Sequence, residues 1–233
     1  MTTIPTIDIS PFLSSTFDQT AQSQTAQNLY DAFSTWGFCL LKNTAIPPTL
    51  RQSLFRSAQD FFALPDDKKL ELHVKKGGVA WRGYMPKGGE ATHGHLDHKE
   101  GMYFGPEHPD DHRHAGLPLH GRNRFPDDTV PEMRHAVLAW IDQITNLGNA
   151  VSDAISLSLG LEREFMRKTY LAPEPVAIVR CFKYTAPETK SEDEGKQAWG
   201  IGEHTDFGYL TLLTTDSLGF KYSPRAGTGS TFQ

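Results

Sequence analysis

The chain has 233 residues, of which 38% are hydrophobic and 22% are charged, and its formal net charge is −5. This length fits one large domain or two small ones, and the composition is that of an ordinary globular protein with enough chain to bury a core. The negative charge and the lack of a Lys/Arg tract give no basis for binding nucleic acid or an anionic membrane surface.

The sequence predicts neither a leader nor a membrane span. No basic segment followed by an apolar one stands at its start, and no apolar run is long enough to cross a bilayer. Cys39 and Cys181 lie in apolar stretches, which is typical of buried thiols in a reducing compartment, and a disulfide between them is the alternative. We therefore expect a cytoplasmic protein.

The first part of the chain alternates short strands with amphipathic helices. Residues 4–9 alternate apolar and polar side chains, which predicts a strand, and residues 22–36 follow a helical period. Residues 38–41 form a short apolar run that predicts a buried strand. The pair Pro47 and Pro48 then opens a second amphipathic helix, which Pro65 ends.

The middle of the chain combines long loops with the longest helix. Residues 77–128 are rich in Gly, Pro, His and charged side chains, which predicts loops with short strands, and such loops usually serve a site. Residues 131–160 carry the longest helical period, and a short helix is expected over residues 162–170.

Two more strands are predicted at residues 176–182 and 209–213, with a polar loop at 185–198 between them. Helices early in the chain and strands late in it indicate an α+β fold. We expect residues 1–130 and 131–233 to be two regions of one integrated domain.

The candidate metal site is the pair His204 and Asp206, which follows a glycine-rich turn and precedes the apolar residues 209–213. Side chains two positions apart in a strand point the same way, so the imidazole and the carboxylate would lie side by side. They would supply two of the three ligands of a two-His-one-carboxylate triad, which leaves positions open on Fe(II). A hydrogen-bonded polar pair at a strand edge is the alternative.

Residues 200–213, Gly-Ile-Gly-Glu-His-Thr-Asp-Phe-Gly-Tyr-Leu-Thr-Leu-Leu, resemble the first metal-ligand segment of the isopenicillin N synthase-like oxygenases. Four further stretches resemble that family in the same order, and the resemblance extends from residue 4 to about residue 219. They are Ile-Pro-Thr-Ile-Asp at 4–8, Gly-Phe-Cys-Leu-Leu-Lys-Asn at 37–43, Phe-Phe-Ala-Leu-Pro at 61–65, and the loop region from Arg-Gly-Tyr at 82–84 to Phe-Gly at 104–105.

The resemblance implies a distorted jelly-roll core and Fe(II) held by His204, Asp206 and a second histidine. It also implies 2-oxoglutarate as co-substrate, which yields succinate and CO2 while O2 oxidises a small organic substrate. Tyr184 aligns with a family tyrosine that bonds a carboxylate of 2-oxoglutarate. The alternative interpretation is that Tyr184 packs at the edge of the core with its hydroxyl satisfied. Arg82 and Tyr84 lie where the family lines its substrate pocket, with loop packing as the alternative.

The end of the sequence departs from the family pattern. His204 is the last histidine of the chain, and the Arg-x-Ser pair that clamps 2-oxoglutarate in the family does not follow Asp206. We therefore expect the later strands of the jelly roll to be missing from this chain. The alternatives are an inactive truncated relative, a non-catalytic binding protein, and a subunit whose barrel a second chain completes.

A competing motif runs from His93 to His98 and has the His-x-His-x-Asp-His form of the metallo-β-lactamase-like hydrolases, in which zinc activates water. That motif should follow a buried strand and open a helix, whereas a polar Gly-rich segment precedes it here. Solvated loop histidines are the preferred interpretation. The later histidines of this loop region are also predicted to be exposed; they are His108, His112, His114 and His120.

Overall fold

The computed structural model describes residues 3–185, 200–202, 204–206 and 208–217. Nearly all of the polar loop expected at 185–198, and the segment after residue 217, lie outside these residues. The chain divides into two compact units. Unit 1 contains residues 1–48, 142–176 and 209–233, and unit 2 contains residues 49–141 and 177–208.

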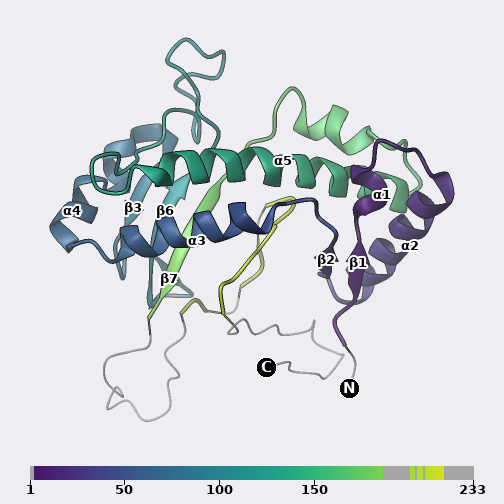
Figure 1. The fold of residues 1–233 in the computed structure, drawn as a ribbon, viewed down its shortest axis with the longest axis horizontal. Coiled ribbons are helices and arrows are strands. Elements are labelled where there is room, and N and C mark those ends of the chain that lie inside the picture. The colour runs from purple at the N-terminus through teal and green to yellow at the C-terminus, as the bar shows by residue number, and fades with distance from the viewer. Residues whose placement is uncertain (1–2, 186–199, 203, 207, 218–233) are drawn as a thin grey trace. The chain divides into compact units, whose positions relative to one another are not determined.

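Figure 1 shows the elements in chain order. The α-helices are α1 (Ser10–Leu13), α2 (Gln19–Thr35), α3 (Pro48–Phe62), α4 (Asp66–Glu71) and α5 (Glu132–Ser158). A 3-10 segment, η1 (Val74–Ala80), and a π-helical turn, η2 (Arg167–Leu171), complete the helical elements of the described residues. The strands are β1 (Thr6–Asp8), β2 (Leu40–Lys42), β3 (Gly83–Met85), β4 (Ala91–Thr92), β5 (His95–Leu96), β6 (Lys99–Phe104) and β7 (Val179–Tyr184).

Unit 1 is built around a parallel pair of strands joined by a helix. Thr6 of β1 lies opposite Leu40 of β2. The connecting helix α2 begins at Gln19, earlier than the hydrophobic period indicates, because the Asp18 carboxylate accepts a hydrogen bond from the Ala21 N–H at 2.9 Å and caps the first turn. Its inner face joins one apolar core with residues from β1, α1 and α5: Ile7, Ile9, Phe12, Leu29, Ala32, Leu147, Ala150, Val151 and Ala154.

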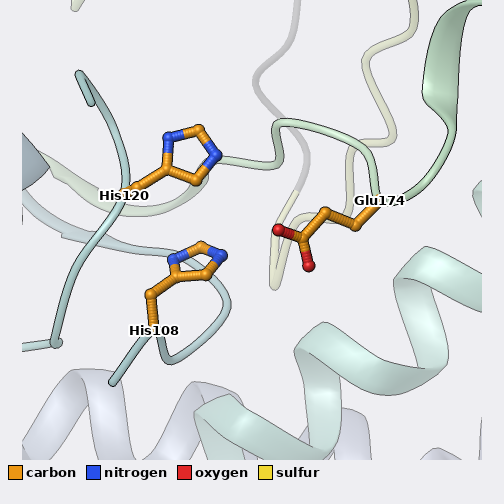
Figure 2. A group of neighbouring side chains, drawn as sticks. All are labelled: His108, His120 and Glu174. Carbon is orange, nitrogen blue, oxygen red and sulfur yellow. The ribbon is translucent and has the colours of Figure 1, made fainter. Parts of the chain in front are cut away.

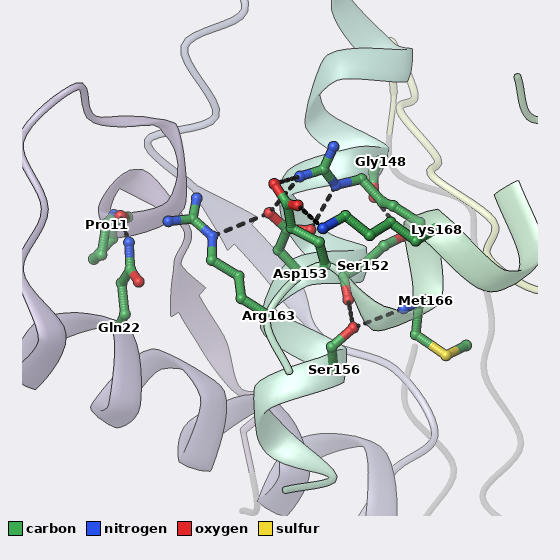
Figure 3. Close-up of polar contacts among 11 residues, drawn as sticks. Pro11, Gln22, Gly148, Ser152, Asp153, Ser156, Arg163, Met166 and Lys168 are labelled. Atoms are coloured by element: carbon green, nitrogen blue, oxygen red, sulfur yellow. Dashed lines mark hydrogen bonds and ion pairs between the residues drawn. The ribbon is translucent and has the colours of Figure 1, made fainter. Parts of the chain in front are cut away.

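The segment after α5 is attached to the last turns of that helix by a buried carboxylate (Figure 3). The Asp153 side chain is only 3% exposed, and its two oxygens accept from Arg163 Nε at 3.1 Å and Arg167 Nε at 2.6 Å. Ser156 Oγ accepts from the Met166 N–H at 3.2 Å. These bonds satisfy a charge that would be costly to bury alone, and they hold η2 beside α5.

Unit 2 contains a three-stranded antiparallel sheet in the order β3-β6-β7 (Figure 1). Paired residues share a face, so Lys99 and its partner Tyr184 point to one side of the sheet. Tyr84 pairs with Met102 in β3 and β6, and both point to the other side. Every residue of β6 is buried, which identifies it as the central strand.

Helix α3 buries the face that its hydrophobic periodicity predicts. The buried residues on this face are Leu54, Ala58, Phe61 and Phe62. The Phe61 ring meets the Tyr84 ring edge to face at 5.7 Å, which ties this helix to β3. The mixture of helices with a mainly antiparallel sheet agrees with the predicted α+β class.

Three strand predictions need correction. The strand expected to be buried at 38–41 lies at Leu40–Lys42, and none of its residues is buried. The strand expected at 176–182 lies at Val179–Tyr184, because its ladder follows the partners that β6 offers. The prediction of a strand at 209–213 is wrong, since this stretch pairs with no described strand. It nevertheless keeps a two-residue alternation, in which Leu210 and Leu212 pack on the core of unit 1 while the residues between them are exposed.

The two cysteines are free thiols, so the alternative of a disulfide is wrong. Burial raises the pKa of Cys39 to about 11 and that of Cys181 to about 12, which keeps both thiols protonated and unreactive near neutral pH. Among the described helices, none combines the length and the apolar character that a bilayer span requires.

Candidate metal centre

His204 and Asp206 present two donor atoms side by side. His204 Nδ1 lies 2.9 Å from the Gly202 carbonyl oxygen, so it carries the proton and donates, and Nε2 is left with its lone pair. That Nε2 lies 3.3 Å from Asp206 Oδ1. The side chains are 40% and 47% exposed, so an ion can reach them. The two residues lie in irregular chain, not in the strand that the sequence predicts, and the turn at Gly202 fixes the imidazole instead.

This pair fits a first-row divalent ion. Such ions hold nitrogen and oxygen ligands at about 2.0–2.2 Å, so two neighbouring ligands of an octahedral ion lie about 3 Å apart. The bond from Nδ1 to a backbone carbonyl is the usual support of a metal-bound histidine. No third His, Cys, Asp or Glu within the described part of the chain completes a three-ligand group with them.

Tyr184 stands at the end of β7, next to the turn that leads to His204. A Cβ atom added to Gly200 would lie 2.5 Å from Tyr184 Cδ1, so only glycine allows the turn to lie against this ring. The hydroxyl is on a side chain that is 44% exposed. Partial burial raises the pKa of Tyr184, with Lys99 and Arg180 opposing that shift, so the group is a hydroxyl donor at neutral pH.

A charged network that sequence reasoning missed lies on the Tyr184 face of the sheet. Lys99 is 5% exposed, and its Nζ lies 3.0 Å from Glu90 Oε2 and 3.0 Å from Asp97 Oδ2. The Tyr103 hydroxyl donates to the other oxygen of Glu90. The alternation of Lys99, Gly101 and Tyr103 along one strand was the available signal, because it places these side chains on one face.

Arg82 is completely buried, at 0% exposure. Its Nη2 donates to the Leu119 carbonyl at 2.8 Å, while Nε and Nη1 have no hydrogen-bond partner among the described residues. Burial lowers the pKa of Arg82 to about 10, and the charge of Glu107 opposes that shift. The guanidinium is thus charged at neutral pH and holds the loop that contains Leu119.

Tyr84 is 3% exposed and points to the face of the sheet opposite Tyr184. Its hydroxyl donates to Glu100 Oε2 at 2.7 Å, and Lys69 Nζ lies 2.8 Å from the same oxygen. Burial and the bond to Glu100 raise the pKa of Tyr84. Its polar group therefore has internal partners, and the predicted contact with substrate rests on the family resemblance alone.

The competing zinc motif folds as a β-hairpin. β4 and β5 flank a turn at His93 and Gly94, both with positive φ (51° and 81°), the pattern of a tight two-residue hairpin turn. The hydrolase motif needs a helix at this point. Asp97, the carboxylate of that motif, is bound to Lys99. The zinc hydrolase alternative therefore has no support.

The sequence predicts that the histidines farther along this loop region are exposed, but the structure buries two of them. His108 is 6% exposed and His120 is 8% exposed, so that prediction is wrong for these two. Their rings lie 4.8 Å apart (Figure 2). Sequence spacing did not reveal this, because a fold in the loop brings together residues that lie 12 positions apart.

Comparison with known proteins identifies the family. Residues 4–128 match the family model described as non-haem dioxygenase in morphine synthesis N-terminal. A protein of Dictyostelium discoideum, named a probable iron/ascorbate oxidoreductase, is 33% identical over 93% of this chain and 64% of its own length. Clavatol oxidase of Penicillium crustosum is 31% identical over 91% of this chain and 66% of its own length.

Solved structures agree. A full-length Neurospora crassa protein in complex with alpha-KG has a TM-score of 0.68 and 29% identity, covering 88% of this chain and 61% of that one. A 2OG-Fe(II) oxygenase family protein of Caulobacter crescentus has a TM-score of 0.66 and 27% identity, covering 82% and 59%. The chain thus spans less than two thirds of the length of these relatives. It belongs to the family of non-haem, Fe(II)- and 2-oxoglutarate-dependent dioxygenases.

Proposed function

We propose that this chain supplies the Fe(II) site of a 2-oxoglutarate-dependent dioxygenase that oxidises a small organic substrate with O2 and releases succinate and CO2. One observation carries the proposal: the Gly202 carbonyl orients His204 so that Nε2 lies 3.3 Å from Asp206 Oδ1. Family membership and the alpha-KG complex of the Neurospora relative support the same chemistry.

In this proposal His204 and Asp206 hold the ion, which supplies O2 activation when bound. The Tyr184 hydroxyl donates a hydrogen bond to a carboxylate of 2-oxoglutarate. Arg180 pairs across from Tyr103 on the same face of the sheet, and its exposed guanidinium adds positive charge beside that carboxylate. Arg82 and Tyr84 keep the substrate-side loop in place through their bonds to Leu119 and Glu100.

The β3-β6-β7 sheet is, in this proposal, part of a distorted jelly roll like that of the family. The relatives named above give no support to a second chain that completes the barrel. An inactive truncated relative is no better supported than an enzyme, and the zinc hydrolase has no support.

The test is an anaerobic calorimetric titration of the chain with Fe(II), with and without 2-oxoglutarate, on the wild type, His204→Ala and Asp206→Ala. We expect Fe(II) binding that 2-oxoglutarate strengthens and that either substitution abolishes. Succinate release after admission of O2 then reports turnover. His135→Ala is the matched control, because His135 is an exposed imidazole on α5.

Fe(II) binding that survives in both His204→Ala and Asp206→Ala would show that the ion is held elsewhere and would overturn the assignment. Binding without succinate release would retain the metal site and favour the non-catalytic relative.

A further inference from the structure

Four histidine rings form a closed cluster in the loop between β6 and α5, and all four belong to unit 2. Going round the cluster, the ring centres are 4.7 Å apart for His108–His112, 5.3 Å for His112–His114, 5.0 Å for His114–His120 and 4.8 Å for His120–His108. Figure 2 draws two of these rings, His108 and His120, facing the same space; the third residue drawn there, Glu174, belongs to unit 1.

Backbone hydrogen bonds order the chain segments that carry the rings. His108 and Gly121 bond each other: the His108 N–H donates to the Gly121 carbonyl at 3.3 Å, and the Gly121 N–H donates to His108 Nδ1 at 3.3 Å. His112 and His114 sit in consecutive turns, in which their carbonyls accept from Ala115 at 2.8 Å and Leu117 at 3.0 Å. The cluster is therefore part of a structured loop.

This loop is also fastened to the rest of unit 2. Asn123 bonds both the N–H and the carbonyl of Gly105, at 2.9 and 2.7 Å. The Leu119 N–H donates to the Val79 carbonyl at 2.9 Å, and the Leu119 carbonyl accepts from the buried Arg82. Anchors on both sides of the cluster limit the freedom that a ligand would have to remove, which favours binding.

The centres of neighbouring rings are spaced as they are between two ligands of one ion. Zinc–nitrogen bonds of about 2.0–2.1 Å with tetrahedral angles place the centres of two bound imidazoles about 5 Å apart. All four neighbouring distances lie near that value. One nitrogen of His108 lies within 4.8 Å of one of His120, and one nitrogen of His112 lies within 4.8 Å of one of His114. No three of the four histidines bring their nitrogens together in this way, so coordination of one ion requires the rings to turn about their side-chain bonds.

The hydrogen bonds decide how ready each ring is to bind. His120 Nδ1 donates to the Pro118 carbonyl at 2.8 Å, which leaves Nε2 with a lone pair, as in supported metal ligands. His108 and His112 instead accept backbone N–H groups at Nδ1, at 3.3 and 3.2 Å. Binding through their Nε2 atoms moves a proton to Nδ1 and breaks these two long bonds. Each costs about 1 kcal/mol, which is small beside metal binding.

We propose that His108, His112, His114 and His120 form a site for a divalent transition-metal ion of the zinc type, independent of His204 and Asp206. Imidazole nitrogens suit zinc, copper and nickel, while Fe(II) chemistry needs ligand positions that four histidines would fill. A site closed by four protein ligands is structural. Its effect is to fix the loop that buries Arg82.

The test is a Zn²⁺ titration of the whole chain against a chromophoric chelator, comparing the wild type with the double variant His112→Ala/His114→Ala. These two rings are only half-buried, so their removal should leave the fold intact, which circular dichroism checks. We expect the affinity for one equivalent of Zn²⁺ to fall by about 100-fold or more. X-ray absorption of the zinc form should show nitrogen neighbours at about 2.0–2.1 Å.

Two controls separate this site from others. His93→Ala/His98→Ala removes two exposed imidazoles at and beside the hairpin, and His204→Ala removes the candidate iron ligand; both should leave Zn²⁺ affinity unchanged. Zinc affinity that is unchanged in His112→Ala/His114→Ala, or lost in either control, overturns the proposal. An oxygen-dominated shell in the absorption spectrum does the same. Because His204→Ala tests the iron site separately, failure of one site is distinguishable from failure of the other.

Discussion

Lys69 Nζ lies 2.8 Å from Glu100 Oε2, and the two side chains are 6% and 2% exposed. The Tyr84 hydroxyl reaches the same oxygen at 2.7 Å, so α4, β3 and β6 meet at one carboxylate. Removing one partner of such a pair leaves the other charge buried without compensation. That uncompensated charge accounts for most of the loss in the free energy of unfolding.

Lys69→Met should lower the free energy of unfolding by about 3–5 kcal/mol, because Glu100 loses its closest cation. Urea denaturation measures this. Lys68→Met is the matched control: Lys68 and Glu71 form an exposed pair at 2.9 Å, worth at most about 1 kcal/mol. Equal losses in the two variants would show that the buried pair contributes no more than an exposed one.

The same carboxylate makes stability depend on pH. Burial pushes the pKa of Glu100 upward, but hydrogen bonds from Lys69 and Tyr84 outweigh it and hold the pKa below its ordinary value of 4.5. A carboxyl group whose pKa is lower in the folded state stabilises the fold above its unfolded pKa and loses this effect as the pH falls through its folded pKa. The stability difference between the wild type and Glu100→Gln should therefore be largest near neutral pH and shrink below about pH 4.5. Urea titrations at several pH values measure it, and a difference that grows toward acid would contradict the assignment.

Two glycines should respond to alanine with opposite signs. Gly148 lies within α5, and its new Cβ would meet only Leu212 Cδ1 at 3.8 Å, so Gly148→Ala should stabilise by about 0.4–1 kcal/mol. In Gly101→Ala the Cβ would lie 2.6 Å from the Phe182 ring in the paired strand, which should cost about 1–3 kcal/mol. Thermal unfolding of both variants, compared with the wild type, measures these changes in stability. A Gly101→Ala variant as stable as the wild type would mean that the Phe182 ring moves aside freely.

The helices could be predicted from the sequence because their packing follows one local period. Phe61 and Phe62 are buried where the pattern of α3 places them. Residues 209–213 carry an equally clear apolar pattern, yet they form no ladder, because a strand also needs a partner and the pattern of one segment does not supply it.

The site could be predicted only in part for a similar reason. His204 and Asp206 are two residues apart, so a local pattern can single them out as candidates, and their role as ligands stays a prediction. The Glu90–Lys99 pair and the rings of His108 and His120 depend on a hairpin and on a folded loop, whose geometry is set by backbone bonds such as that between Gly121 and His108. Residue type and spacing carry little information about contacts of this kind.

Tyr184 offers the sharpest test of the proposed co-substrate site, because its two interpretations differ by a single hydroxyl. If this hydroxyl donates to a carboxylate of 2-oxoglutarate, Tyr184→Phe removes a hydrogen bond to a charged group. Such a bond is worth about 1.5–3 kcal/mol, so the Kd for 2-oxoglutarate should rise about ten- to hundredfold. The ring, and with it the contact to Gly200, is kept. Anaerobic titration of the Fe(II)-loaded chain with 2-oxoglutarate measures the change, and Tyr170→Phe, at a ring that is 67% exposed, is the control. An unchanged Kd in Tyr184→Phe would make this tyrosine a packing residue that supports the turn before His204 and nothing more.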